Sequence, residues 1–361
     1  MRCLCGAALL CALAVCVARA QASGASTAAV AAGAKLAYVT ETSSSASTVW
    51  VANADGTGAQ SLGLGDDPLI SPNGQMVAAS LFGTGSGTET GPALGLYSTV
   101  GAAGASYLRL STANVVPLAW SPDSRYLAAF LMSTSLRDIA QRSGLIVLDT
   151  STGAVKTIAH GQIYGASFAP DGSDRIAYAS ARTLSGTAPT NIYISNPDGS
   201  GLHAFTHDGH SLNPVWGERY LAFDRERFRR DAYPAFQIWL AVTRPGAVVP
   251  RRLTNVKDAL LVSGLVPLAF SADGTRLVSE LEGEDTSEAW AVTVSSGHVQ
   301  RLTSHGRGVV ASGISRDGSE VLIDEGAFEQ PQSSGRVASI PFTGGRASVI
   351  VAQGTQGSWN G

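Results

Sequence analysis

Two charged segments contain the side chains best suited to binding chemistry. The first, Asp224–Asp231, holds four arginines and three acids in eight residues. An arginine guanidinium can grip a carboxylate or a phosphate through two parallel hydrogen bonds. The candidate binding residues of this segment are Arg225, Arg227, Arg229 and Arg230. In the alternative interpretation the opposite charges neutralise one another within a loop, and the arginines then have a structural role.

The second segment, Glu280–Glu288, is acidic. Hard cations such as Ca²⁺ take several carboxylate oxygens, but the glycine-punctuated alternation of acids that marks a calcium loop is missing. We therefore expect no cofactor, with a bound Ca²⁺ ion as the alternative. Both segments are interpreted as long loops on neighbouring repeats, and together they form the candidate rim. The candidate binding residues of the second segment are Glu280, Glu282, Glu284 and Asp285.

The histidines are weak candidates for a metal site. His203, His207 and His210 lie close together in the sequence, and His207 and His210 could supply two metal ligands. Imidazole is a common metal ligand, but histidines on a connecting segment are usually polar surface groups. We expect no metal site, and we keep His207 and His210 as weak candidates.

No catalytic residue is predicted. Gly85-Ser86-Gly87 lies in a Gly/Thr-rich stretch without the strand and helix that flank a hydrolase nucleophile. The sequence also has no glycine-rich nucleotide loop and no metallohydrolase motif. These features favour a protein that is not an enzyme.

An internal repeat predicts the elements that must position the charged residues. A bulky residue is followed by a small residue, often Pro, then by Asp or Asn and Gly, and then by an apolar strand. Pro restricts φ and Gly accepts positive φ, so each copy predicts a tight turn between two strands. The bulky residues are Ile70, Trp120, Phe168, Trp216, Phe270, Ile314 and Trp359.

Each repeat contains four short strands, which is typical of one blade of a β-propeller. The sequence therefore predicts an all-β fold, a single propeller over residues 35–361. Seven blades are preferred, and six is the alternative if the unit near residues 68–110 is irregular. The C-terminal segment Gly357–Asn360 is expected to pair with Lys35–Val39 and close the ring, which removes the exposed sheet edges of an open array.

The turns and strands also resemble a known family. A Ser-Pro-Asp-Gly type of turn, as at Ser121-Pro122-Asp123 and Ala169-Pro170-Asp171-Gly172, is followed by a strand, then by a strand that contains Tyr or Trp, and then by an Asp-Gly turn. This order resembles the TolB-like β-propeller repeat, which is similar to WD repeats but lacks their Gly-His and Trp-Asp pairs. The resemblance spans residues 35–361 and implies the fold. It implies little about function, because such propellers serve many roles. We expect no counterpart of the partner-binding N-terminal domain of TolB, so its envelope role is not transferred.

The first residues indicate export. Residues 1–20 resemble a signal peptide, with Arg2, an apolar run and Ala18-Arg19-Ala20 before an expected cleavage at Gln21. Residues 21–34 predict a flexible leader. A secreted, periplasmic or cell-envelope location is expected. The alternative is a lipid anchor at Cys16, although Val15 departs from the lipoprotein motif. No later stretch is long and apolar enough for a transmembrane span.

Charge and composition narrow the function further. The formal net charge is −3, which argues against a nucleic-acid partner. We expect a monomeric, non-enzymatic binding or scaffold module for a protein, peptide or glycan partner. The alternative is a propeller enzyme, similar to a lactonase or lyase, that works from the central funnel. Such an enzyme needs polar groups on the inner strands, which here end in apolar residues.

Overall fold

The computed structural model describes most of the repeat region. The described residues are 33–43, 46–81, 92–101, 105–109, 113–133, 142–181, 188–229, 232–243, 249–256, 262–283, 287–304, 308–326 and 335–360. The expected signal peptide, Cys16 and nearly all of the expected leader lie outside these ranges. Within them, no helix has the length and apolar character needed to cross a bilayer.

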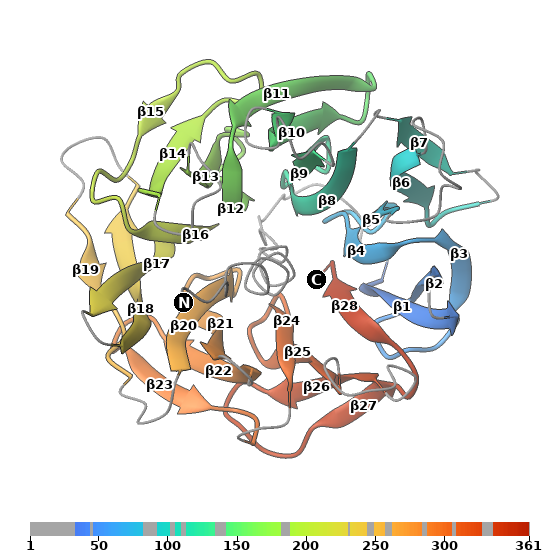
Figure 1. Ribbon diagram of the computed structural model, residues 1–361. Coiled ribbons are helices and arrows are strands. Elements are labelled where there is room, and N and C mark those ends of the chain that lie inside the picture. The colour runs from blue at the N-terminus through green and yellow to red at the C-terminus, as the bar shows by residue number, and fades with distance from the viewer. Residues whose placement is uncertain are drawn as a thin grey trace, which may run out of the picture.

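The described strands form seven four-stranded antiparallel groups around a ring, and each group is called a blade here (Figure 1). The all-β propeller prediction is confirmed, and the strand groups are consistent with seven blades rather than six. Blade 1 contains β28 (Thr355–Trp359), β1 (Lys35–Ser43), β2 (Ala46–Asn53) and β3 (Gln60–Leu64). Blade 2 contains β4 (Asp66–Ile70), β5 (Met76–Ser80), β6 (Pro92–Ser98) and β7 (Ser106–Arg109).

The remaining blades follow in chain order. Blade 3 contains β8 (Ala113–Trp120), β9 (Tyr126–Ser133), β10 (Gly144–Asp149) and β11 (Ala154–His160). Blade 4 contains β12 (Gln162–Phe168), β13 (Ile176–Ala181), β14 (Asn191–Ser195) and β15 (His203–Ala204). Blade 5 contains β16 (Ser211–Trp216), β17 (Tyr220–Arg229), β18 (Ala232–Val242) and β19 (Arg251–Arg252). Blade 6 contains β20 (Val262–Phe270), β21 (Arg276–Gly283), β22 (Ser287–Thr293) and β23 (His298–Arg301). Blade 7 contains β24 (Val310–Ile314), β25 (Glu320–Glu325), β26 (Arg336–Pro341) and β27 (Ser348–Val351).

The repeated turn forms because its side chains bond to its own backbone. In blade 3 the Ser121 hydroxyl accepts from the Tyr126 N–H at 2.8 Å, and the Asp123 carboxylate accepts from the Arg125 N–H at 3.0 Å. The glycine of the motif takes positive φ, as at Gly274 (66°). Ser124 holds the same conformation (66°) without being glycine. Side-chain bonds and a left-handed residue thus reverse the chain between the first and second strands of a blade.

The core lies between blades. All seven bulky residues of the repeat are buried, and the hydrophobic clusters combine side chains from adjacent blades. Trp120, for example, donates its indole N–H to the Leu69 carbonyl of blade 2 at 3.0 Å. A Cβ at Gly217 would lie 2.7 Å from the Phe270 ring of blade 6. Blades therefore stabilise one another through side chains that no single repeat could bury.

The C-terminal strand completes blade 1. β28 pairs with β1, with Leu36 opposite Trp359 and Ala37 opposite Ser358. Asn360 adds a side-chain bond, since its Oδ1 accepts from the Lys35 N–H at 2.6 Å. Figure 1 shows this last strand beside the first strands of the chain. The pairing agrees with the expected ring closure.

The candidate rim differs from its predicted form. Residues 224–229 belong to strand β17, and residues 280–283 belong to strand β21, so these parts are not loops. Backbone pairing in a hairpin does not depend on side-chain polarity, and the partner strand β18 is rich in aromatic and β-branched residues. Arg230, Glu284 and Asp285 lie outside the described residues.

Candidate functional site

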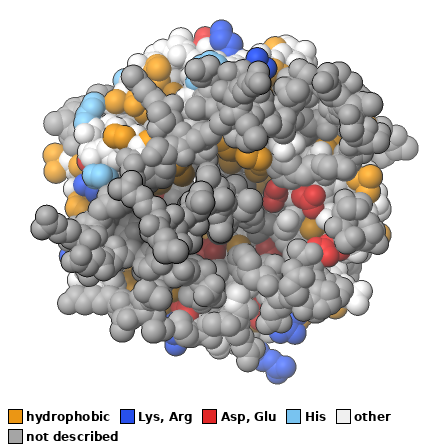
Figure 2. Space-filling view, viewed as in Figure 1, with side chains coloured by type: hydrophobic (Ala, Val, Ile, Leu, Met, Phe, Trp, Pro, Cys, Tyr) orange, Lys and Arg blue, Asp and Glu red, His pale blue; other side chains and the backbone are white. Residues whose placement is uncertain are grey.

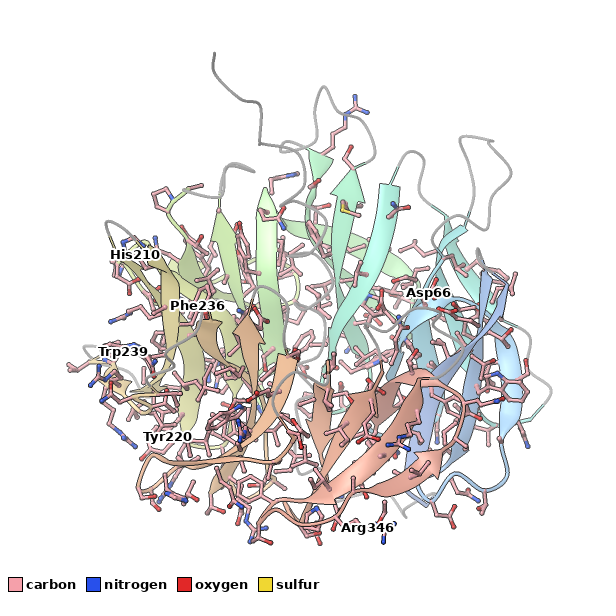
Figure 3. All side chains as sticks on the ribbon, turned by 60° about the horizontal axis from the view of Figure 1, so that its bottom comes forward. Asp66, His210, Tyr220, Phe236, Trp239 and Arg346 are labelled. Atoms are coloured by element: carbon pink, nitrogen blue, oxygen red, sulfur yellow. The ribbon has the colours of Figure 1, made fainter. Side chains whose placement is uncertain are left out.

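The two ends of the blades differ in the connections that they hold. One end holds the turns between the first and second strands and is called the turn end. The opposite end holds the connections between the second and third strands and is called the loop end. Figure 3 shows Tyr220, at the start of β17, toward the turn end and His210 toward the loop end of the same blade. The candidate rim lies on the loop-end halves of β17 and β21.

Three inner strands, those of blades 1, 2 and 5, share a distorted position near the loop end. Asp67, Asn213 and Gln356 have positive φ values of 49°, 45° and 58°, and each lies three residues before the bulky residue of its strand. The strand register shifts at these positions. Gln356 also reaches the next blade, where its Oε1 accepts from the Asp67 N–H at 2.7 Å. Bulges and strained residues of this kind are concentrated next to functional sites.

Three consecutive blades place a carboxyl at one equivalent position. Asp224, Glu280 and Asp324 each lie three residues after the residue that pairs with the bulky one, in blades 5, 6 and 7. All three are at most 2% exposed. A buried carboxyl needs hydrogen-bond partners, so each of these side chains must bond to a group on a neighbouring strand or segment.

The partners of these carboxyls are structural. Asp224 accepts from the Asn213 side-chain N–H at 2.9 Å, and Glu280 accepts from the Ser287 hydroxyl. Asp324 accepts from the Gly357 N–H at 2.9 Å and so connects blade 7 to β28. Glu280 is therefore not an exposed group of a rim. The sequence interpretation missed the set, although the equal offsets within the repeat could have identified it.

Other acids near the loop end have raised pKa values. Burial raises the pKa of Glu282 to about 7. The pKa of Glu41 is raised by burial first and then by the negative charge of Asp66. Figure 2 looks onto the loop end and shows acidic side chains gathered beside β4 and β1. The inner part of this end is therefore acidic, with one carboxyl that titrates near neutral pH.

Arg225 is engaged within blade 5. Its guanidinium forms an ion pair with Asp208 at 2.7 Å and lies over the Trp239 ring, 4.3 Å from the centroid. A guanidinium held by a carboxylate and an aromatic face stabilises the fold and is not free to bind a partner. Arg225 therefore has a structural role, although its ion-pair partner Asp208 lies outside the segment Asp224–Asp231. Arg227 and Arg229 lie in β17, beyond this anchored base.

The histidine candidates occupy the connection between blades 4 and 5. His207 and His210 are exposed, and the His210 backbone N–H donates to Asp208 at 2.8 Å. His203 lies in β15, and its ring contacts the Gly201 carbonyl. Across the described ranges, no three His, Cys, Asp or Glu side chains are placed to hold a metal ion.

The two halves of the candidate rim meet in one sheet. Phe236 of β18 pairs in parallel with Gly264 of β20, and Gly264 pairs with Glu282 of β21. This single parallel pair joins blades 5 and 6 into an eight-stranded sheet. The arginine-bearing hairpin and the acidic strand are thus neighbours, as the sequence predicted for adjacent blades.

Comparison with known proteins identifies the fold. No protein-family model and no curated protein matches the chain. The β-propeller domain of the Trilobed protease from Pyrococcus furiosus is similar over 89% of this chain and 95% of that one, with TM-score 0.60 and 12% identity. An oligogalacturonate lyase from Vibrio parahaemolyticus is similar over 77% and 80%, with TM-score 0.54 and 13% identity. TolB from Acinetobacter baumannii is similar over 90% and 82%, with TM-score 0.50 and 16% identity.

These similarities concern architecture. They confirm the likeness to a TolB-like β-propeller that the repeat predicts. The similar structures include a protease domain, a lyase and TolB, so the shared fold is compatible with binding and with catalysis. The function must therefore be argued from this chain's own side chains.

Proposed function

We propose that the protein is an exported, non-enzymatic binding module that holds a protein, peptide or glycan partner at its loop end. The β17–β18 hairpin is the main contact, and the arginines favour an acidic partner. The single observation that supports this proposal is the hairpin itself. Its strands have 10 and 11 residues, longer than every other described strand.

The hairpin combines a fixed base with an extension of both strands beyond it. β16 pairs with β17 only as far as Arg225, opposite Ser211. Beyond that residue the pairing of β17 continues with β18 alone, to Arg229 opposite Ala232. The Arg225–Asp208 ion pair and the Trp239 ring hold the base, while Phe236 ties the hairpin to blade 6. Rigid scaffolds that present charged segments in this manner are well suited to recognition.

The test removes two arginines beyond the anchored base. Immobilised wild-type protein and the Arg227→Ala/Arg229→Ala double variant are compared in pull-downs from culture fluid or native envelope extract. We expect the captured partner to be lost from the double variant, and to be released from the wild type by high salt, because exposed ion pairs are screened.

A matched control separates binding from net charge. Arg219→Ala/Arg252→Ala removes the same charge at two exposed arginines of blade 5 that lie on the turn-end side of the anchored base. This variant should capture the partner normally. If both double variants capture the partner equally well, the hairpin is not the contact. If only the first variant unfolds at lower temperature, Arg227 and Arg229 are structural ion-pair partners.

Export is tested separately. N-terminal sequencing of protein recovered outside the cytoplasm should begin near Gln21. A lipid-modified start at Cys16 would replace free secretion with anchoring, and an uncleaved cytoplasmic product would contradict both.

A further inference from the structure

A crevice at the turn end is independent of the loop-end surface. It lies between the strands of blade 3 and the turn that joins β14 to β15 in blade 4, and its volume is about 420 Å³. This volume falls in the range of small-molecule sites. The residues that matter for its chemistry are Tyr126, Val147, Lys156, Asn196, Pro197 and Asp198.

The walls of the crevice are held in place. Gly199 of the blade 4 turn has a φ of 82°, and a Cβ there would lie 3.5 Å from Cγ2 of Ile158 in β11. On the turn, Asp198 Oδ1 accepts from the Ser200 N–H at 2.9 Å, and the Asn196 side-chain N–H donates to the Ser200 hydroxyl at 2.9 Å. The turn is therefore braced internally and packs on blade 3.

Some polar groups of the crevice are already saturated. Asp149 Oδ2 accepts from Arg125 Nη2 at 2.8 Å, and its Oδ1 accepts from the Ser151 N–H at 3.0 Å. These bonds, led by Arg125, hold the pKa of the Asp149 carboxyl well below its ordinary value. The same guanidinium lies over the Tyr126 ring at 4.8 Å. Asp149 and Arg125 thus shape the crevice and offer little to a ligand.

Other polar groups keep their bonding capacity. Within the described part of the chain, Lys156 Nζ makes no hydrogen bond or ion pair, and Asp198 Oδ2 and Asn196 Oδ1 accept none. The crevice therefore presents a strong donor opposite two acceptors. Lys156 and Asp198 carry opposite charges, so the pair is neutral overall and favours an uncharged ligand.

The crevice also has apolar walls that a ligand could contact. Val147, Ala154 and Pro197 line it beside the polar groups. Ala154 and Lys156 share one face of β11, because alternate residues of a strand point the same way. A ligand for this surface needs a C–H face and an edge of hydroxyls that both donate and accept. We propose that this crevice binds a neutral saccharide, at a site separate from the loop-end surface.

The test uses defined sugars as probes. Maltose, cellobiose, lactose and N,N′-diacetylchitobiose are titrated into the full chain and followed by NMR chemical-shift changes. We expect saturable binding of at least one sugar, weakened at least fivefold by Lys156→Met, which keeps the length of the side chain and removes its charge and donors.

A matched variant and a second probe make the outcome decisive. Arg346→Met removes an exposed cation after the third strand of blade 7, toward the turn end in Figure 3, and should bind the sugar like wild type. Binding that is unchanged in Lys156→Met, or no saturable binding of any of the four sugars by wild type, would overturn the proposal. So would Lys156-dependent binding of the zwitterion glycylglycine at equal or higher affinity, because the site would then be one for charged termini. Each readout is independent of the loop-end pull-down, so the two proposals can fail separately.

Discussion

Glu282 lies at the loop-end half of β21, where burial raises the pKa of its carboxyl to about 7. A raised pKa means that the folded protein binds this proton more tightly than the unfolded chain does. The free energy of unfolding therefore falls as the pH rises from about 4.5 to about 7, and this stabilisation is lost above that window.

Glu282→Gln removes the ionisable group and should flatten this part of the pH dependence. At pH 8 the variant should be more stable than wild type by on the order of 3 kcal/mol, and near pH 4 the difference should vanish. Urea unfolding at a series of pH values measures both. Glu218→Gln at the exposed turn of blade 5 serves as control and should follow the wild-type profile. A parallel profile for Glu282→Gln would show that this carboxyl ionises as it does in water.

Among the elements, the β17–β18 hairpin depends on a single glycine in the neighbouring blade. Gly264 has a φ of 127°, and a Cβ there would overlap the backbone of Phe236. Only glycine allows the parallel pair between β18 and β20, because any side chain would force these two strands apart.

Gly264→Ala should therefore break the connection between blades 5 and 6. We expect a loss of about 2 kcal/mol or more in urea unfolding, together with weaker partner capture at the loop end. Gly172→Ala is the matched control, since Gly172 has a φ of 74° but no atom within 4 Å of the added Cβ. It should lose only about 1 kcal/mol from backbone strain. Equal losses for the two variants would mean that the parallel pair contributes little.

At the scale of the whole molecule, β28 connects the end of the ring to its beginning. It pairs with β1, and its Gly357 N–H donates a hydrogen bond to the Asp324 carboxylate of blade 7. It also contacts blade 2, where Ser358 Oγ accepts from the Ile70 N–H at 3.1 Å. Trp359 is buried in a cluster with side chains of blades 1 and 7. Removing this strand would expose the edge of β1 and leave the Asp324 carboxylate without the Gly357 donor.

Deleting residues 356–361 should lower the Tm by several degrees or more, because a buried aromatic residue alone contributes roughly 1.5–3 kcal/mol. A rescue variant places residues 354–360 before Lys35 through a short glycine turn. This geometry is feasible because the Asn360 side chain already bonds to the Lys35 backbone. The rescue should recover most of the lost stability in a thermal melt. An unchanged Tm in the deletion would show that the ring does not depend on this strand.

The sequence by itself determined the repeat and, through it, the architecture. Bulky residues such as Trp120 and turns such as Ser121-Pro122-Asp123 are local signals, since the same short segment carries the turn chemistry and the apolar strand that follows. The pairing of the C-terminal segment with Lys35–Val39 was predictable for the same reason, because a repeat with a missing strand indicates where that strand must come from.

Only the tertiary structure decided which polar side chains are buried, paired or available. Arg225 appeared to be a binding residue but is held by Asp208 and Trp239, and Glu280 appeared to lie on a loop but is buried in a strand. Lys156 belongs to no sequence motif, yet it lines a crevice because a turn of the next blade lies opposite it. Burial and hydrogen bonding arise where separate blades meet, and the local pattern of one repeat does not specify the side chains that its neighbour supplies.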